Sequence, residues 1–151
     1  MNRTVMVMCM QLVCMPLAAC ATQDPRPATI RLGEDACASC RMTIVSVQSA
    51  AQIVSPGAEP ILFDEIGCLR DYLADTSLSE AALVFVADHR TGEWIDARHA
   101  VFTKTAVATP MSSGLLAHAD LRSRDADDRA SGGTSMAADA VLGSRLRSVQ
   151  P

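Results

Sequence analysis

The fold is decided by the stretch "ILFDEIGCLRDYLADTSLSEAALVFVAD", residues 61–88, in which three apolar residues lead into a predicted helix and then a predicted strand. Asp64 is a favourable N-cap residue, and Glu65 places an acid in the first helical turn. Apolar residues then recur at helical spacing as far as Leu73. The run 81–88 is continuously apolar and has the length of a strand.

The segments before this stretch extend the pattern. Residues 43–55, "TIVSVQSAAQIVS", are rich in Ile and Val with partial alternation, and predict a pair of strands. The segment "SPGAEP", residues 55–60, predicts a turn. The element order up to residue 88 is therefore β-β-α-β.

The second half repeats this order weakly. "GEWIDA" (92–97) and "HAVFTKTAV" (99–107) predict strands, and "TPMSSGLLAHADL" (109–121) predicts a turn that leads into a helix. From Arg122 onward the chain is rich in Ser, Gly, Ala and charge. We interpret residues 122–151 as a mostly disordered tail, with a short helix near 137–146.

The first residues have the features of a secretory signal, namely an early Arg, a short apolar run and small residues before a cysteine. Their ending "LAAC" is similar to the lipobox of bacterial lipoproteins. We therefore expect residues 1–19 to be a signal peptide and Cys20 to carry lipid. Residues 20–29 would form an extended, Pro-containing linker. By the same resemblance, Ala21 after the cysteine favours the outer membrane.

Composition narrows the function classes. The net charge is −4 and the pI about 5.2, so nothing favours binding to nucleic acid or to an anionic membrane surface. Signal cleavage and lipidation would leave an odd number of cysteines: Cys37, Cys40 and Cys68. At least one of these three cannot form an intramolecular disulfide.

The segment "CASCRM", residues 37–42, places two thiols and a thioether close together. A disulfide or half of a zinc site is the ordinary interpretation of Cys37 and Cys40 in an exported protein. A redox pair normally opens a helix, whereas here a predicted strand follows. Thiolate and thioether are soft ligands that select Cu(I), so Met42 favours a soft-metal site.

The remaining candidate ligands are single residues. Met111 follows a proline at the mouth of a predicted helix, where core packing explains it less easily, although a single Met is more often a packing residue than a ligand. Cys68 is interpreted as a small buried hydrophobe, with a disulfide as the alternative. His89, His99 and His118 lack metal-ligand spacing and are interpreted as surface or strand-end residues, although His89 or His99 could add an imidazole. No hydrolase, phosphate-loop or zinc-protease motif is present, so we expect no enzyme.

These segments, taken in order, resemble the NosL lipoproteins, copper chaperones associated with assembly of nitrous oxide reductase. The resemblance covers about Cys20 to Leu121 and rests on "LAAC", "CASCRM", "FDEIGCLRDYL", "VFVADHRTGEWIDARHAVF" and "TPMSSGLLA". The chain departs from the family at Arg41, where Gly is usual, and at "MSSG", where "MGSG" is common. Glycine would allow a positive φ without cost.

The resemblance implies an α+β fold of two small ββαβ units, about 30–88 and 89–121. It implies Cu(I) binding in the periplasm and delivery to the reductase's copper clusters, beside its membrane transport complex. Cys40 and Met42 match the family's Cys and Met, and Met111 matches the Met of "TPM". His99, Cys37 and His89 are candidates for the remaining ligands. A thiol-disulfide reductase using Cys37 and Cys40, or a structural lipoprotein with these cysteines oxidised, is the competing hypothesis.

Overall fold

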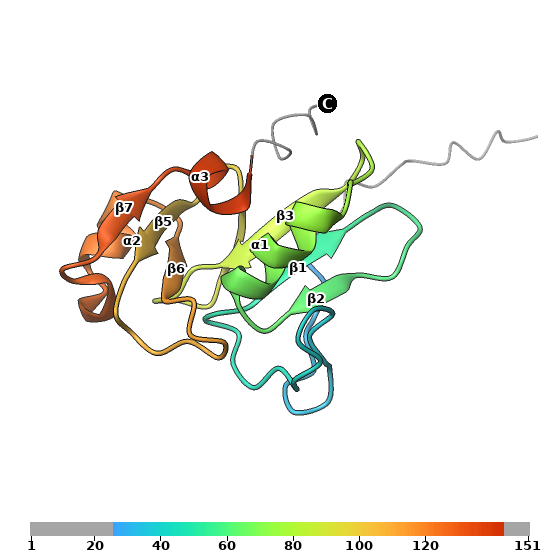
Figure 1. Cartoon of the computed structure of the whole chain (residues 1–151), viewed down its shortest axis with the longest axis horizontal. Coiled ribbons are helices and arrows are strands. Elements are labelled where there is room, and N and C mark those ends of the chain that lie inside the picture. Colours follow the sequence, from blue (N-terminus) through green and yellow to red (C-terminus); the bar gives the residue numbers. More distant parts are fainter. Residues whose placement is uncertain (1–25, 144–151) are drawn as a thin grey trace, which may run out of the picture.

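A computed structural model describes residues 26–143, and Figure 1 shows its two antiparallel sheets side by side. The first sheet contains β1 (Ala51–Val54), β2 (Ile61–Phe63), β3 (Leu83–Ala87) and β4 (Trp94–Asp96). The second contains β5 (Val101–Lys104), β6 (Leu115–His118) and β7 (Thr134–Met136). The helical segments are α1 (Ile66–Asp75), α2 (Leu121–Asp125), the 3₁₀ turn η1 (Asp128–Ala130) and α3 (Ala138–Leu142). The fold is mixed α and β with separate antiparallel sheets, as the α+β class predicts.

The first sheet has the strand order β2-β1-β3-β4, and its elements run β-β-α-β along the chain before β4, although the second strand is β2 and not part of segment 43–55. The expected strand pair over residues 43–55 is wrong, because only β1 forms there. A turn separates the two halves of that segment, and within it the Ala50 N–H donates to the Val47 carbonyl at 2.8 Å. Before the turn, Thr43 makes only an isolated bridge with Ala36.

Helix α1 starts slightly later than the sequence predicts. Its N-cap is Glu65, which makes no side-chain capping bond, so the expected Asp64 cap is wrong. The Asp64 carboxylate instead accepts a hydrogen bond from the Cys40 thiol. Ile66, Leu69 and Leu73 form the buried face, at the predicted helical spacing.

The boundary expected at residues 88 and 89 is wrong, because β4 pairs with β3 and belongs to the first sheet. The helix expected within 109–121 is also wrong over residues 115–118, which form β6. All four residues of β6 are buried, so the run lacks the polar positions that distinguish a strand from a helix. Strand β5 pairs with β6 on one side and β7 on the other.

The expected disordered tail is wrong for residues 122–143, which complete the second sheet. Strand β7 pairs with β5, and α3 buries Val141 and Leu142 in the main core. Gly133 allows this close packing, because a Cβ there would lie 2.5 Å from the Thr103 Cγ2 atom. The second sheet therefore has the element order β5-β6-α2-β7, again strand, strand, helix, strand. Residues 144–151 lie outside the described chain.

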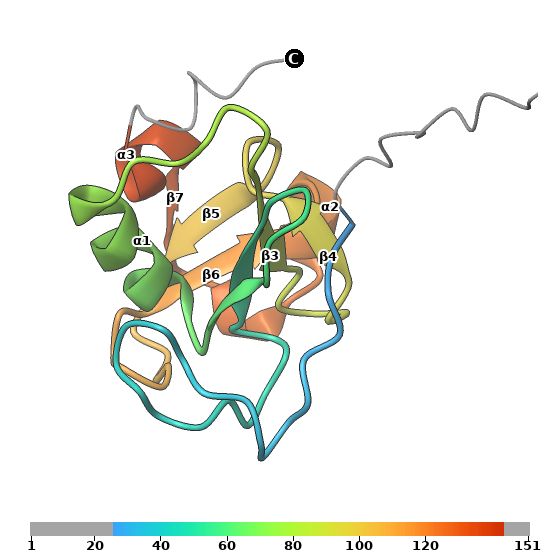
Figure 2. The same ribbon diagram turned by 90° about the vertical axis from the view of Figure 1, so that its right-hand side faces the viewer.

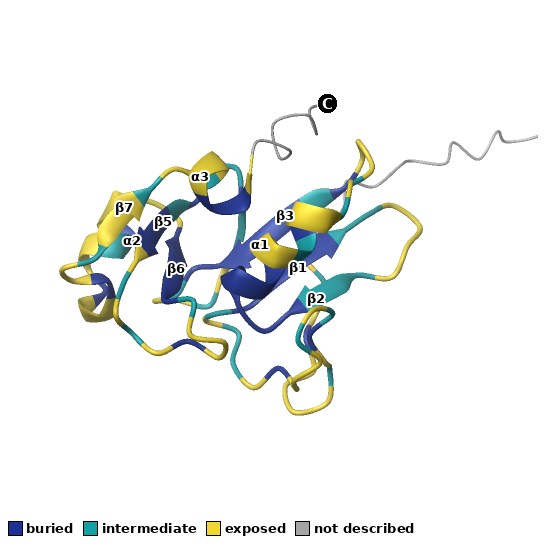
Figure 3. Cartoon of the chain, in the orientation of Figure 1, coloured by how far each residue is buried: buried dark blue, intermediate teal, exposed yellow. Residues whose placement is uncertain are grey.

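The two sheets share one hydrophobic core. Val84 and Val86 of β3 belong to the same buried cluster as Phe102 of β5 and Leu115 of β6. Helix α1 covers this core with one face and exposes the other, as the burial colours of Figure 3 show. Within residues 26–143, no helix combines the length and apolar character that a membrane crossing requires.

The end of the expected linker is attached to the first sheet. The Ala28 N–H donates to the Gln52 side-chain oxygen at 2.7 Å, and the Gln52 amide donates back to the Ala28 carbonyl at 3.2 Å. Ile30 follows in a small second core cluster. The expected signal peptide and Cys20 lie outside the described residues.

Candidate metal centre

The CASCRM segment is a loop closed by its own backbone. The Cys37 N–H donates to the Met42 carbonyl at 2.8 Å, and the Arg41 N–H donates to the Cys37 carbonyl at 3.0 Å. The Ala38 N–H donates to the Leu62 carbonyl at 2.8 Å and ties the loop to β2. Backbone bonds therefore fix the directions in which the two thiols point.

Arg41 has φ of 66°, in the left-handed region that favours glycine. Its side chain is exposed, so the conformation follows from the tight loop and not from a side-chain contact. The only other described non-glycine residue with positive φ is Ser112, at 62°. Ser112 directly follows Met111.

We expect Arg41→Gly to raise the free energy of unfolding by up to about 1 kcal/mol and Arg41→Val to lower it by roughly 1–2 kcal/mol. A left-handed residue that carries a Cβ costs roughly 1–2 kcal/mol, and the greater freedom of glycine in the unfolded chain offsets part of the gain from removing the Cβ. Valine is expected to destabilise because a β-branched side chain fits the left-handed region still less well than Arg. Urea denaturation followed by circular dichroism measures both. Arg41→Ala is the control and should change little. Equal stability of the Gly and Val variants would contradict the strained loop.

Helix α1 brings a third thiol to this loop, and the turn between β2 and α1 brings a carboxylate. The ligand atoms of Cys37, Cys40, Asp64 and Cys68 all lie within 4.8 Å of one another. The Cys40 thiol donates to Asp64 Oδ2 at 3.4 Å. No disulfide joins the three cysteines, which are all free. This thiol cluster, defined by these four residues, is the candidate metal centre.

The cluster sits in surroundings that disfavour uncompensated negative charge. Cys37 and Cys68 are almost fully buried. Burial raises the pKa of the Cys68 thiol far above its usual range, and its hydrogen bond with Asp64 acts in the same direction. Burial likewise raises the pKa of Cys40. Without a cation these two thiols stay protonated at neutral pH, and a bound metal ion would displace their protons.

Two carboxylate oxygens beside the thiols are buried without a partner. Among the described residues, Asp64 Oδ1 and Glu65 Oε2 have no hydrogen-bond donor. An unpaired buried carboxylate oxygen is costly, whereas a cation next to it would compensate the charge. The donor set therefore fits a positively charged ion better than it fits an empty structural core.

A cavity of about 390 Å³ opens beside the thiol cluster and is lined by Cys40, Cys68 and Met111. The loop between β5 and β6 lies beside the CASCRM loop, as Figure 2 shows. It carries Met111, which lines the cavity together with Cys40. Close packing holds that loop against α1, because a Cβ on Gly67 would lie 2.6 Å from the Ser113 Cβ. Met111 is half exposed at the mouth of the cavity.

The structure brings some predicted ligands together and leaves others apart. Cys37 and Cys40 join one cluster, and Met111 lines the adjoining cavity. Met42 belongs to the same loop, but its side chain is 52% exposed and does not line the cavity. His99 and His89 are not among the residues of the cluster or of the cavity.

Sequence reasoning missed two members of the cluster. Cys68 is buried, as its interpretation as a small hydrophobe predicts, yet its sulfur faces two other thiols. Asp64 was expected to cap the helix and faces the thiols instead. The available signal was the strand-to-helix turn itself, because it places Asp64 and Cys68 at the same end of α1.

Comparisons with protein-family models, with curated proteins and with solved structures gave no significant match.

Proposed function

We propose that this chain is a Cu(I) carrier that binds the ion at the thiol cluster and delivers it to a partner. The observation that carries the proposal is the convergence of three thiols and an unpaired buried carboxylate oxygen beside an open cavity. Such a set binds a thiophilic cation, and the half-open cavity suits release. We infer a carrier and not an enzyme.

Copper(I) is the ion that the surroundings favour. Thiolate and thioether are soft ligands, and Met111 at the cavity mouth adds a thioether to the thiol cluster. Three cysteines with one carboxylate also make the four ligands of a structural zinc site. A structural site is closed, however, whereas here the cavity reaches Cys40 and Cys68.

Release by ligand exchange follows from the unequal burial of the ligands. Cys37 and Cys68 are buried, while Cys40 is partly exposed and Met111 is half exposed. A soft ligand of a partner would enter through the cavity and first replace Met111 or Cys40. The two buried thiols would hold the ion until the new bonds have formed.

The proposed destination of the copper rests on the resemblance to the NosL lipoproteins. We infer a NosL-like role, in which a lipid anchor on Cys20 holds the chain at the outer membrane facing the periplasm. The copper would go to nitrous oxide reductase, beside its membrane transport complex. In support, the two Gly positions of the family motif correspond to Arg41 and Ser112, which have positive φ here. The loops thus keep the conformation for which glycine is suited.

The reductase alternative has less support from the geometry. A redox pair usually places its reactive thiol at a helix N-terminus, which lowers the thiol pKa. Cys37 and Cys40 lie in a loop, and Cys37 is buried. A third thiol within the same cluster also offers a ligand that a simple redox pair does not need.

The proposal is tested by anaerobic titration of the reduced chain with Cu(I) against a competing chelator. We expect tight binding, weakened roughly tenfold or more by Met111→Leu, because removal of even a supporting group near a metal typically costs this much. Met136→Leu is the matched control, since Met136 lies on β7 and does not line the cavity. Met42→Leu tests the other predicted thioether in the same assay.

Each contrary result has a definite meaning. No binding above that of the chelator would contradict the carrier. Unfolding of the metal-free chain together with preference for zinc would indicate a structural zinc site. Turnover of a disulfide substrate by the Cys37 and Cys40 pair would indicate the reductase.

A further inference from the structure

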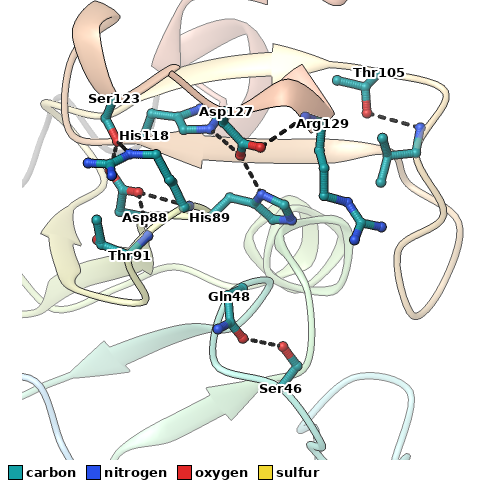
Figure 4. Close-up of polar contacts among 12 residues, drawn as sticks. Ser46, Gln48, Asp88, His89, Thr91, Thr105, His118, Ser123, Asp127 and Arg129 are labelled. Carbon is teal, nitrogen blue, oxygen red and sulfur yellow. Dashed lines mark hydrogen bonds and ion pairs between the residues drawn. The ribbon is translucent and has the colours of Figure 1, made fainter. Parts of the chain in front are cut away.

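A second group of ligand atoms meets at the far end of the second sheet. His89 follows β3, His118 ends β6, and Asp127 precedes η1. Their ligand atoms lie within 4.8 Å of one another. His89 Nδ1 is 2.6 Å and His118 Nε2 is 3.0 Å from the same oxygen, Asp127 Oδ2. Figure 4 shows both rings directed at this carboxylate.

Backbone contacts hold the two histidines next to each other. The His89 N–H donates to the Ala117 carbonyl at 2.8 Å, which links the end of β3 to β6. The ring centroids are 6.2 Å apart. Asp127 is fixed by its own turn, since its Oδ1 accepts the Arg129 N–H at 2.9 Å. The fold therefore positions all three side chains before any ligand arrives.

Structural hydrogen bonding accounts poorly for this arrangement. His118 is fully buried, and its Nδ1 has no hydrogen-bond partner among the described residues. Its Nε2 contacts Asp127 Oδ2, and the His89 ring contacts the same oxygen. A buried imidazole whose one partner is shared with a second imidazole is costly for the fold, and a bond from Nε2 to a metal ion would replace that shared hydrogen bond.

We propose that His89, His118 and Asp127 bind a divalent metal ion of intermediate hardness, of which zinc is the probe of choice. Two imidazole nitrogens and one carboxylate oxygen are ligands that zinc accepts readily, and they leave a coordination position free. A cavity of about 290 Å³ lies on the Asp127 side of this group. The site shares no residue with the thiol cluster and does not depend on the proposed copper function.

The chain offers a matched set of variants for the test. Zinc is titrated into the reduced full-length chain against a chromophoric chelator, and cobalt(II) replaces it for spectroscopy. We expect a zinc equivalent that His89→Gln and Asp127→Asn each weaken by more than about tenfold, because even supporting groups of a metal site are worth that much. His99→Gln is the control, since His99 belongs to neither cluster.

Spectroscopy separates the two clusters. The cobalt that the wild type binds and His89→Gln does not bind should show no thiolate charge-transfer absorption. The cobalt that Cys68→Ala fails to bind should show this absorption. Asp127→Asn keeps the side-chain shape and guards against a folding artefact, which a thermal melt by circular dichroism checks. If the His89 and Asp127 variants fold and bind every equivalent that the wild type binds, the three residues are only a structural hydrogen-bond network and the proposal fails.

Discussion

Replacing Cys68 by Ala is expected to lower the affinity of the reduced chain for Cu(I) by at least about a hundredfold, which is the upper end of what loss of a supporting residue costs a metal site. The effect should be large because Cys68 would be a direct ligand and α1 holds it in place. Its sulfur lies within 4.8 Å of the ligand atoms of Cys37, Cys40 and Asp64. The described residues contain no fourth thiol that could replace it.

The fold should survive this change. Cys68 is a small buried side chain, and removing one buried methylene-sized group costs roughly 1 kcal/mol. Val141→Ala is the matched control, because Val141 is equally buried in α3 but contributes no ligand. We expect it to lose similar stability and to keep wild-type copper affinity. Competition with a Cu(I) chelator and urea denaturation are measured on the same samples.

A contrary result would be equally informative. Wild-type affinity in a folded Cys68→Ala variant would restrict the metal site to the CASCRM loop and Met111. Asp64 would remain a candidate ligand in that case, because its carboxylate also contacts the Cys40 thiol.

Helix α1 and strand β3 of the first sheet could be predicted because their signals are local. A turn, an amphipathic helix and an apolar strand follow one another between residue 55 and residue 88. In the second sheet, β5 lies within a predicted strand, but β6 and β7 could not be predicted because they lack such signals. Strand β6 is apolar at every position but its last, and β7 is the segment "TSM", whose Thr and Ser are exposed. Both form because β5 offers them two free edges, a tertiary cause that periodicity does not contain.

The sequence predicted the type of ligand at the candidate site, but not the full set of residues that form it. The CASCRM segment already carries the thiols and their soft character. Cys68 and Asp64 join it only because the Ala38 N–H ties the loop to β2, directly before α1. The histidine cluster needed still more of the fold, since its members come from three elements of the two halves. Sequence spacing therefore did not predict that Cys68, His89 and His118 join clusters of ligand atoms, because only the tertiary fold brings these residues to their neighbours.

The second large effect is expected at Asp88, where Asp88→Ala should lower the free energy of unfolding by roughly 3–5 kcal/mol. Asp88 is buried at the end of β3 and joins the two sheets. Its Oδ2 accepts the Ala119 N–H at 2.9 Å and the Ser123 hydroxyl at 2.7 Å. Its Oδ1 accepts two further backbone N–H groups, from Arg90 and Thr91. The variant would leave four donors without their acceptor, and Figure 4 shows part of this network.

The dependence on pH identifies the carboxylate as the cause. Burial raises the pKa of Asp88, but the hydrogen bonds from Ala119, Ser123 and the turn outweigh it and lower the pKa overall. A lowered pKa contributes stability above about pH 4, which is lost as the pH falls through the folded-state value. The gap between wild type and Asp88→Ala should therefore be widest near neutral pH and shrink in acid. Asp71→Ala, which removes an exposed carboxylate from α1, should cost less than about 0.5 kcal/mol at any pH. Chemical denaturation at several pH values measures both, and a gap for Asp88→Ala that stays constant with pH would show that lost packing, not the charged acceptor, holds the two sheets together.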